Sequence, residues 1–197
     1  MQKFRLGKVT LSALAFTLVI VLPLGATTLL QMNLQDLCNN AGKVAHVTIV
    51  DMDTGSIQVG GADLPTVTYK ALVNDALKGT FTENKGDLVM EFTMVGTLKQ
   101  GGAQVGDHQA VVSLPTLPHL EVGGEYILMT TPESAIGLST TVGLGQGAFR
   151  VYEESKVEMV VNEFNNNGLF AGMGGTHGSG PVTYNELVDA IRAAVAQ

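Results

Sequence analysis

Residues 44–57 read VAHVTIVDMDTGSI, a largely apolar and β-branched run that leads into a polar stretch. The run from Val44 to Val50 is typical of a strand, because β-branched side chains fit a pleated, half-buried surface. After two glycines, residues 66–73 predict a second strand, whose shared apolar face consists of Val67, Tyr69, Ala71 and Val73. This pair of strands indicates a β-sheet protein.

Further short strands are predicted along the chain. Residues 88–95 alternate between apolar and polar side chains, which is typical of a strand with one buried face. Glycines and prolines separate the other candidates, which are residues 110–114, 126–130, 142–144, 149–152 and 157–161. No strand alternates with a crossover helix, so the sequence favours a mainly β fold, a small antiparallel barrel or sandwich.

One short helix is expected before the first strand and another at the carboxyl end. Asn33 is a suitable N-cap for apolar residues at helical spacing up to Ala41, and Gly42 ends this helix. Thr183 and Glu186 form a capping box at the start of an amphipathic helix in residues 181–197. The Gly- and Asn-rich residues 162–180 are expected to be a loop or a flexible linker.

Residues 1–26 have the plan of a secretory signal peptide. Basic residues precede an apolar run from Val9 to Leu24, and the small residues Gly25 and Ala26 follow it. An uncleaved anchor is the alternative, although the run is short against the about 20 residues that a membrane span needs. The chain is therefore expected to be exported, periplasmic or secreted, with no stable membrane span after cleavage.

The exported part of the chain would be strongly acidic. Removing residues 1–26 takes away three of the 11 Lys and Arg and none of the 18 Asp and Glu, which leaves 8 against 18, a net charge of −10. Such a surface repels phosphate backbones, so we expect no nucleic-acid partner.

Cys38 is the single cysteine of the chain. An internal disulfide is therefore excluded, and the core must stabilise the domain. The thiol is either buried and inert or part of an intermolecular bridge.

The tetrapeptide Asp53-Thr54-Gly55-Ser56 matches the catalytic signature of pepsin-like and retroviral-type aspartic proteases. Such enzymes need two close aspartates, of which one is protonated and the other ionised. A homodimer would have to supply the second copy of Asp53. The same residue types favour a hairpin turn, and this is the preferred interpretation, with the homodimeric protease as the alternative.

No other motif predicts a catalytic set or a cofactor. Metal-binding His and Cys clusters are missing, and the glycines at 172–175 fit neither a P-loop nor a dinucleotide fingerprint. Two alternatives stay open: a metal site assembled from Asp107, His108 and His119, and an N-terminal nucleophile at Thr27 after cleavage. The expectation is a protein without a catalytic site, metal or cofactor.

Residues 142–151, VGLGQGAFRV, are the most distinctive part of the chain. Three glycines two residues apart indicate a β-bulge or the close approach of another backbone. The polar and aromatic side chains among them make Gln146, Phe149 and Arg150 the candidate partner-binding surface.

Six segments carry a resemblance to known proteins: residues 27–29, 33–41, 44–50, 66–79, 120–128 (LEVGGEYIL) and 142–151. Their order resembles a group of uncharacterised exported bacterial proteins and, more distantly, the netrin-like and TIMP-like modules. The resemblance covers most of residues 27–161 and implies an OB-like β-rich domain there. It also implies a binding or envelope module, with an envelope or extracellular protein as partner. TIMP-like inhibitors depend on an N-terminal cysteine, where this chain has Thr27, so no inhibitory residue is transferred.

Overall fold

The computed structural model describes residues 30–98, 111–112, 117–173 and 178–196. The predicted signal peptide (residues 1–26), Thr27, Asp107 and His108 lie outside the described residues. The helices and strands follow one another as α1 (Leu34–Asn40), β1 (Lys43–Val59), β2 (Ala62–Lys78), β3 (Thr82–Asn84), β4 (Asp87–Val95), β5 (Thr97–Leu98), β6 (Val111–Val112), β7 (Glu125–Thr130), η1 (Leu144–Gly147), β8 (Ala148–Glu154), β9 (Val157–Asn162), β10 (Val182–Thr183) and α2 (Tyr184–Val195).

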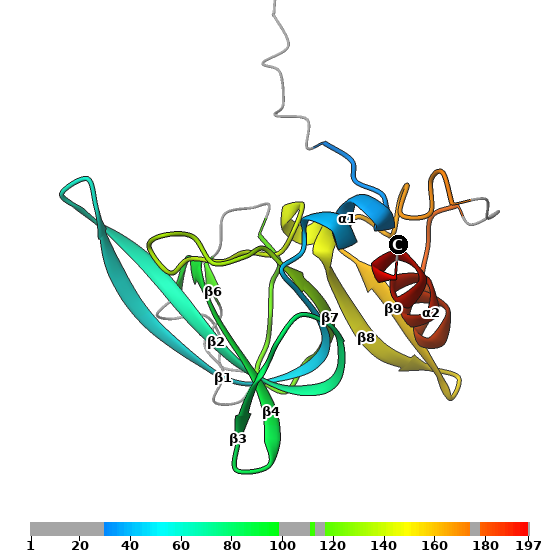
Figure 1. Cartoon of the computed structure of the whole chain (residues 1–197), viewed down its shortest axis with the longest axis horizontal. Coiled ribbons are helices and arrows are strands. Elements are labelled where there is room, and N and C mark those ends of the chain that lie inside the picture. Colours follow the sequence, from blue (N-terminus) through cyan, green and yellow to red (C-terminus); the bar gives the residue numbers. More distant parts are fainter. Residues whose placement is uncertain (1–29, 99–110, 113–116, 174–177, 197) are drawn as a thin grey trace, which may run out of the picture.

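The chain is mainly β, as predicted, and its main sheet is antiparallel. The strand order of this sheet is β10-β9-β8-β7-β1-β2-β4-β3, and β5 pairs with β6 separately (Figure 1). β1, β2 and β4 follow one another as neighbours, and β7 returns to the free side of β1, which is a Greek-key arrangement. In the part of the chain that the structure describes, the sheet is open, with β10 and β3 at its two edges.

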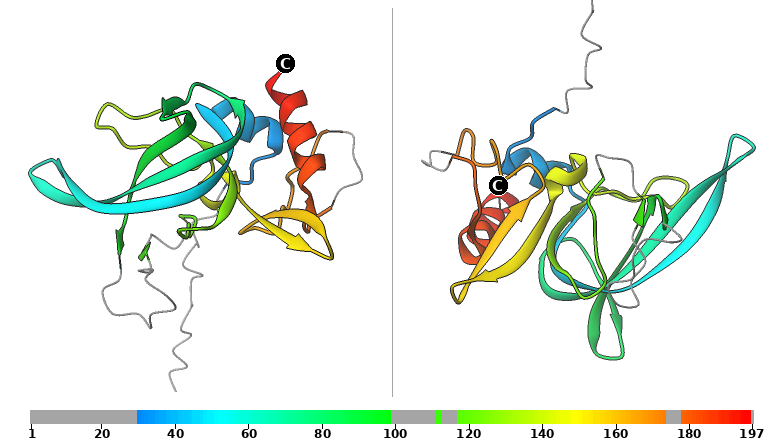
Figure 2. Two further views of the ribbon diagram at one scale, coloured as in Figure 1. Left: turned by 90° about the horizontal axis from the view of Figure 1, so that it is seen from below. Right: turned by 180° about the vertical axis from the view of Figure 1, so that it is seen from behind.

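β1 and β2 form a long hairpin of two 17-residue strands. The chain turns at Gly60 and Gly61, whose φ angles of +60° and +84° suit a two-residue hairpin turn. Beyond residue 55, where β2 no longer pairs with β4, the hairpin projects as a two-stranded arm (cyan in Figure 1; Figure 2). The predicted turn at residues 53–56 is therefore wrong, because these residues pair with residues 65–68 inside the hairpin. The Gly-Gly pair adopts positive φ without steric cost, so it decides where the chain turns.

Two hydrophobic cores lie on opposite sides of the sheet. The helix-side core packs α1 and α2 against β7, β8 and β9, and it contains Leu37, Phe149 and Leu187. The strand-side core lies within β1, β2, β4 and β7, where Tyr69 stacks on Phe92 at 5.2 Å between ring centroids. β7 contributes alternate residues to both cores, which explains why its sequence after Glu125 is continuously buried.

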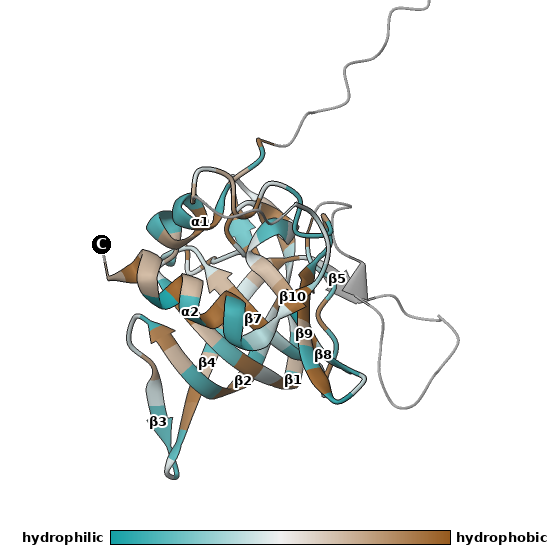
Figure 3. Cartoon of the chain, turned by 90° about the vertical axis from the view of Figure 1, so that its right-hand side faces the viewer, coloured by the Kyte–Doolittle hydropathy of each residue, from teal (hydrophilic) through white to brown (hydrophobic). Residues whose placement is uncertain are grey.

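Both predicted helices are confirmed. The Asn33 side chain accepts a hydrogen bond from the Asp36 backbone N at 2.8 Å and caps α1. Thr183 caps α2 by accepting from the Glu186 backbone N at 3.3 Å. α2 presents an apolar face to the sheet and a polar face outward (Figure 3), and an ion pair of 2.8 Å joins Arg192 to Asp75 of β2.

Two local predictions need correction. The predicted strand at 142–144 is instead a turn that leads into the 3-10 helix η1, because Gly143 and Leu144 both have φ near +60°. Residue 162 is the last residue of β9, and residues 163–173 do form turns, as expected of a loop. They are not a free linker, however, because Leu169 and Phe170 pack into the helix-side core, and β10 then adds to β9.

Cys38 lies in the helix-side core with 1% of its surface exposed. Burial raises the pKa of its thiol from the ordinary 9.0 to about 11, against a smaller lowering by Lys78. A higher pKa means less of the reactive thiolate, by about 100-fold at pH 8 for two pKa units.

We therefore expect a disulfide reagent such as DTNB to label the folded protein at pH 8 at least 100-fold more slowly than the protein in urea. Rapid labelling, or a covalent dimer on a non-reducing gel, would contradict this burial.

Candidate functional site

The three residues of the predicted partner-binding surface lie in different environments. Phe149 is fully buried in the helix-side core, and Gln146 is 4% exposed. Only Arg150 is exposed. The surface prediction was therefore wrong for Phe149 and Gln146, because β8 alternates between faces and directs Phe149 toward the helices while Arg150 points to the other side.

Gln146 has a structural role. Its Oε1 accepts a hydrogen bond from the Met32 backbone N at 2.8 Å, and its Nε2 donates to the Leu30 carbonyl at 2.9 Å. These two bonds fix the segment that leads into α1. A buried amide with its donor and acceptor both in use stabilises local structure.

Arg150 lines a concavity of about 200 Å³ on the face of the sheet that carries the strand-side core. The connection that precedes β7 forms one wall, and β7, β8 and β9 form the floor. Apolar contacts come from Pro118, Leu120, Ala148 and Val161, and polar groups from His119, Glu121, Tyr126, Arg150 and Glu163. We call this concavity the Arg150 site. It is smaller than the about 300–1,000 Å³ of pockets for drug-sized ligands, so it suits one chemical group or one residue of a ligand.

The two glutamates of the Arg150 site are both engaged with His119. The His119 backbone N donates to Glu163 Oε1 at 3.1 Å, and the His119 Nε2 lies 3.8 Å from Glu121 Oε1. Both ends of the latter pair are about half exposed, at 46% and 55%, so the pair contributes little to stability. These contacts hold the wall of the site against β9.

Tyr126 forms the polar floor next to Arg150, its cross-strand neighbour in the β7–β8 register. The Tyr126 hydroxyl oxygen accepts a hydrogen bond from the Glu121 backbone N at 3.1 Å. The pKa of Tyr126 is raised, chiefly because burial disfavours the charged phenolate. The hydrogen bond from the Glu121 backbone and the charge of Arg150 lower this pKa, and the charge of Glu121 raises it, by smaller amounts. Tyr126 therefore stays a neutral phenol at physiological pH.

The guanidinium of Arg150 forms no ion pair with any residue that the structure describes. Its five N–H donors suit a carboxylate, which they bind through two parallel hydrogen bonds. The lining residues include no serine, threonine or cysteine nucleophile. The arrangement can thus bind and orient an anionic group.

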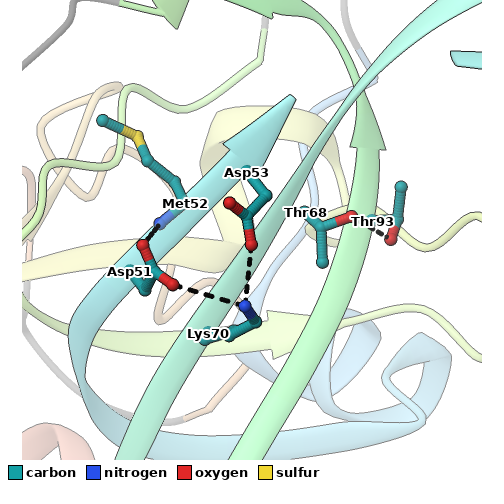
Figure 4. A network of polar contacts seen from close by, with 6 residues as sticks. All are labelled: Asp51, Met52, Asp53, Thr68, Lys70 and Thr93. Carbon is teal, nitrogen blue, oxygen red and sulfur yellow. Dashed lines mark hydrogen bonds and ion pairs between the residues drawn. The ribbon is translucent and has the colours of Figure 1, made fainter. Parts of the chain in front are cut away.

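Asp53 lies on β1 opposite Thr68 of β2, which in turn pairs with Thr93 of β4, and it is not part of the Arg150 site. Its Oδ2 is 2.7 Å from the ammonium of Lys70 on β2, and Asp51 lies 3.3 Å from the same ammonium (Figure 4). The pKa of Lys70 is raised, chiefly by the hydrogen bond to Asp53 and then by that to Asp51. Asp53 is 63% exposed, so the geometry is that of a solvated cross-strand ion pair.

Neither helix in the described ranges is long and apolar enough to cross a membrane. Over the same residues, no three His, Cys, Asp or Glu side chains come together to hold a metal ion. Of the metal candidates predicted from the sequence, His119 instead forms the wall of the Arg150 site.

The sequence analysis named Arg150 as a candidate but not the side chains that surround it. His119, Glu121 and Glu163 come from connections that lie at least 13 residues from Arg150 in the sequence, and no local pattern brings them together. One signal was present, because the Gly-Glu-Tyr segment at 124–126 places Tyr126 on a predicted strand.

Comparisons with known proteins add no assignment: a scan of protein-family models, a search of curated proteins and a search of solved structures each find no match.

Proposed function

We propose that this chain is an exported, non-catalytic binding module whose Arg150 site binds a carboxylate group on an envelope or extracellular protein. One observation carries this proposal, namely a guanidinium that lacks an ion pair within the described residues and lies in a concavity lined by both apolar and polar side chains. A binding site typically combines apolar walls with a few placed polar groups. Arg150 would supply specificity, and Leu120, Ala148 and Val161 would supply contact area.

The two glutamates that flank Arg150 restrict the charge of the ligand. Glu121 and Glu163 would repel a dianion, whereas a ligand with a cationic group beside its carboxylate would meet both charges. The best fit is therefore the carboxyl end of a peptide that carries a basic residue nearby. The acidic charge of the whole chain favours the same kind of partner.

An OB-like fold is part of this proposal. The Greek-key order β7-β1-β2-β4, continued by β8 beside β7, is compatible with a five-stranded, partly open Greek-key barrel.

The alternative function, a homodimeric aspartic protease that uses Asp53, is less well supported. The Asp53 carboxylate forms an ion pair with Lys70, whereas such a protease needs a second aspartate beside it.

The proposal is tested with a matched pair of probes, the peptide acetyl-Ala-Lys-Ala with a free carboxyl end and the same peptide with an amidated end. We expect only the free acid to shift the NMR signals of residues 148–150 and of the Arg150 side-chain N–H. Arg150→Gln should weaken binding at least about tenfold, since a charge-assisted bidentate contact is lost.

Lys156→Gln is the matched control, because it removes another exposed cation, at the β8–β9 turn. We expect this variant to bind like the unmodified protein. Equal binding of the amidated peptide, no binding of either peptide, or unchanged affinity in Arg150→Gln would reject the proposal, provided that far-UV circular dichroism shows the variant to be folded.

A further inference from the structure

A second concavity, of about 220 Å³, lies on the other side of the Glu163–Phe164 segment from the Arg150 site. Its lining residues are Gln31, Gln146, Phe164 and Asn167. Three of them carry primary amides, one is aromatic and none is ionisable. We call this concavity the amide pocket.

A tight turn places two of these residues side by side. The Asn167 backbone N donates to the Phe164 carbonyl at 3.1 Å. The two residues between them, Asn165 and Asn166, have φ angles of +54° and +52°. Positive φ at both central positions is characteristic of a type I′ turn, and asparagine accepts it better than other residues with side chains. Phe164 and Asn167 thus become neighbours at the rim of the pocket.

Buried hydrogen bonds keep this turn rigid. The Asn162 Oδ1 accepts from the backbone N of Phe164 at 3.0 Å and of Asn166 at 2.9 Å. The Asn162 Nδ2 in turn donates to the Gln146 carbonyl at 3.0 Å. Because Gln146 is itself fixed by the segment before α1, the floor and the rim of the amide pocket form one framework.

Gln31 closes the pocket from the opposite side, and a glycine makes room for it. A Cβ atom at Gly168 would lie 1.9 Å from Gln31 Nε2, and Gly168 also has a φ of +69°. Any larger residue at 168 would displace the Gln31 side chain and strain the backbone. The close approach of Gln31 to the turn therefore depends on Gly168.

The amides at the rim have unused hydrogen-bonding capacity. Within the described chain, the side chains of Gln31 and Asn167 make no hydrogen bond. Each amide offers two N–H donors and an acceptor oxygen. Phe164 lies between them with 38% of its surface exposed, among the few large apolar side chains that are so exposed.

We propose that the amide pocket binds one ring of a neutral saccharide. Sugar hydroxyls both donate and accept hydrogen bonds, which matches primary amides, and the C–H face of the ring can pack on the phenyl ring of Phe164. The absence of ionisable groups from the lining argues against a charged ligand. An extended peptide fits less well, because β8 lies between β7 and β9, and β9 lies between β8 and β10, so strand addition beside either would have to displace a paired strand.

The amide pocket and the Arg150 site share a wall but do not depend on each other. A Cβ at Gly145 would meet Glu163 Oε2 at 2.7 Å and Phe164 Cε2 at 3.2 Å, so both side chains converge over this glycine. Glu163 faces the Arg150 site and Phe164 the amide pocket. Saccharide binding at the amide pocket is therefore independent of carboxylate binding at the Arg150 site.

The test is an NMR titration of the exported chain, residues 27–197, with cellotriose and with chitotriose, and with glycerol as a control polyol. We expect at least one trisaccharide to shift the side-chain NH₂ signals of Gln31 and Asn167, and glycerol to leave them unchanged. Asn167→Ala and Phe164→Ala should each weaken binding about tenfold, and Arg150→Gln should not change it.

Gln58→Ala is the matched control, because it removes an exposed amide from the projecting arm, where its contact is with Asp63. Binding that survives both pocket variants would overturn the proposal. So would shifts produced by the tripeptide acetyl-Gly-Gly-Gly-amide but by neither trisaccharide, or no shift with any probe.

Discussion

Phe149→Ala is expected to lower the free energy of unfolding by about 3–5 kcal/mol, the usual cost of truncating a fully buried phenylalanine. Phe149 has 0% of its surface exposed and packs in the helix-side core between β8 and the two helices. Removal of the ring leaves a cavity that rigid strands on both sides of β8 cannot fill. Urea unfolding followed by far-UV circular dichroism measures the change, since the chain has no tryptophan.

Phe164→Ala is the matched control for this prediction. The same atoms are deleted, but Phe164 is 38% exposed at the rim of the amide pocket. Because much of its ring stays in water in the folded protein, we expect a loss of only about 1 kcal/mol or less. Similar losses in the two variants would contradict the different burial of these two rings.

Asn166→Ala is expected to destabilise the fold by about 2–4 kcal/mol, because it leaves buried backbone groups without partners. Asn166 is 1% exposed. Its Oδ1 accepts from the Asn162 backbone N at 2.9 Å, and its Nδ2 donates to the carbonyls of Val160 and Gly180 at 3.0 Å each. One amide therefore ties the turn to β9 and to the segment before β10. The measurement is again urea unfolding.

Two further variants separate the causes of this loss. Asn166→Gly removes the same hydrogen bonds but accepts the φ of +52° without strain, so it should be nearly as unstable as Asn166→Ala. Asn167→Ala removes an exposed amide from the same turn and should change stability by no more than about 0.5 kcal/mol. If Asn166→Gly were as stable as the unmodified protein, backbone strain and not hydrogen bonding would explain the effect of alanine.

The local elements of the fold could be predicted because their causes lie within a few residues. Asn33 and Thr183 each cap a helix through a backbone N–H three residues later, and the alternating residues 88–95 form one strand with one buried face. The same reasoning failed at residues 53–56. Their composition suits a turn, but Gly60 and Gly61 accept positive φ at lower cost, and cross-strand pairing keeps Asp53 inside β1.

The candidate sites show a similar division. Arg150 was identified from the sequence as a cation on a short strand, yet which face of β8 it would occupy depended on the packing of α1 and α2 against Phe149. The run at 162–173 has the composition of a linker, but Asn162 and Asn166 satisfy buried backbone groups that only the folded sheet brings near them.

The sequence by itself determined a mainly β chain with a capped helix near each end of the described region, because strand periodicity and capping are short-range effects. Only the tertiary structure decided that β7 contributes to two cores and that Arg150 lines one site with His119, Glu121 and Glu163. It also decided that Gln31 and Asn167 line the same pocket. These neighbours are far apart in the chain. Their proximity follows from the return of β7 to the free side of β1 and from the packing of the carboxyl-terminal turns, which long-range burial of apolar surface stabilises.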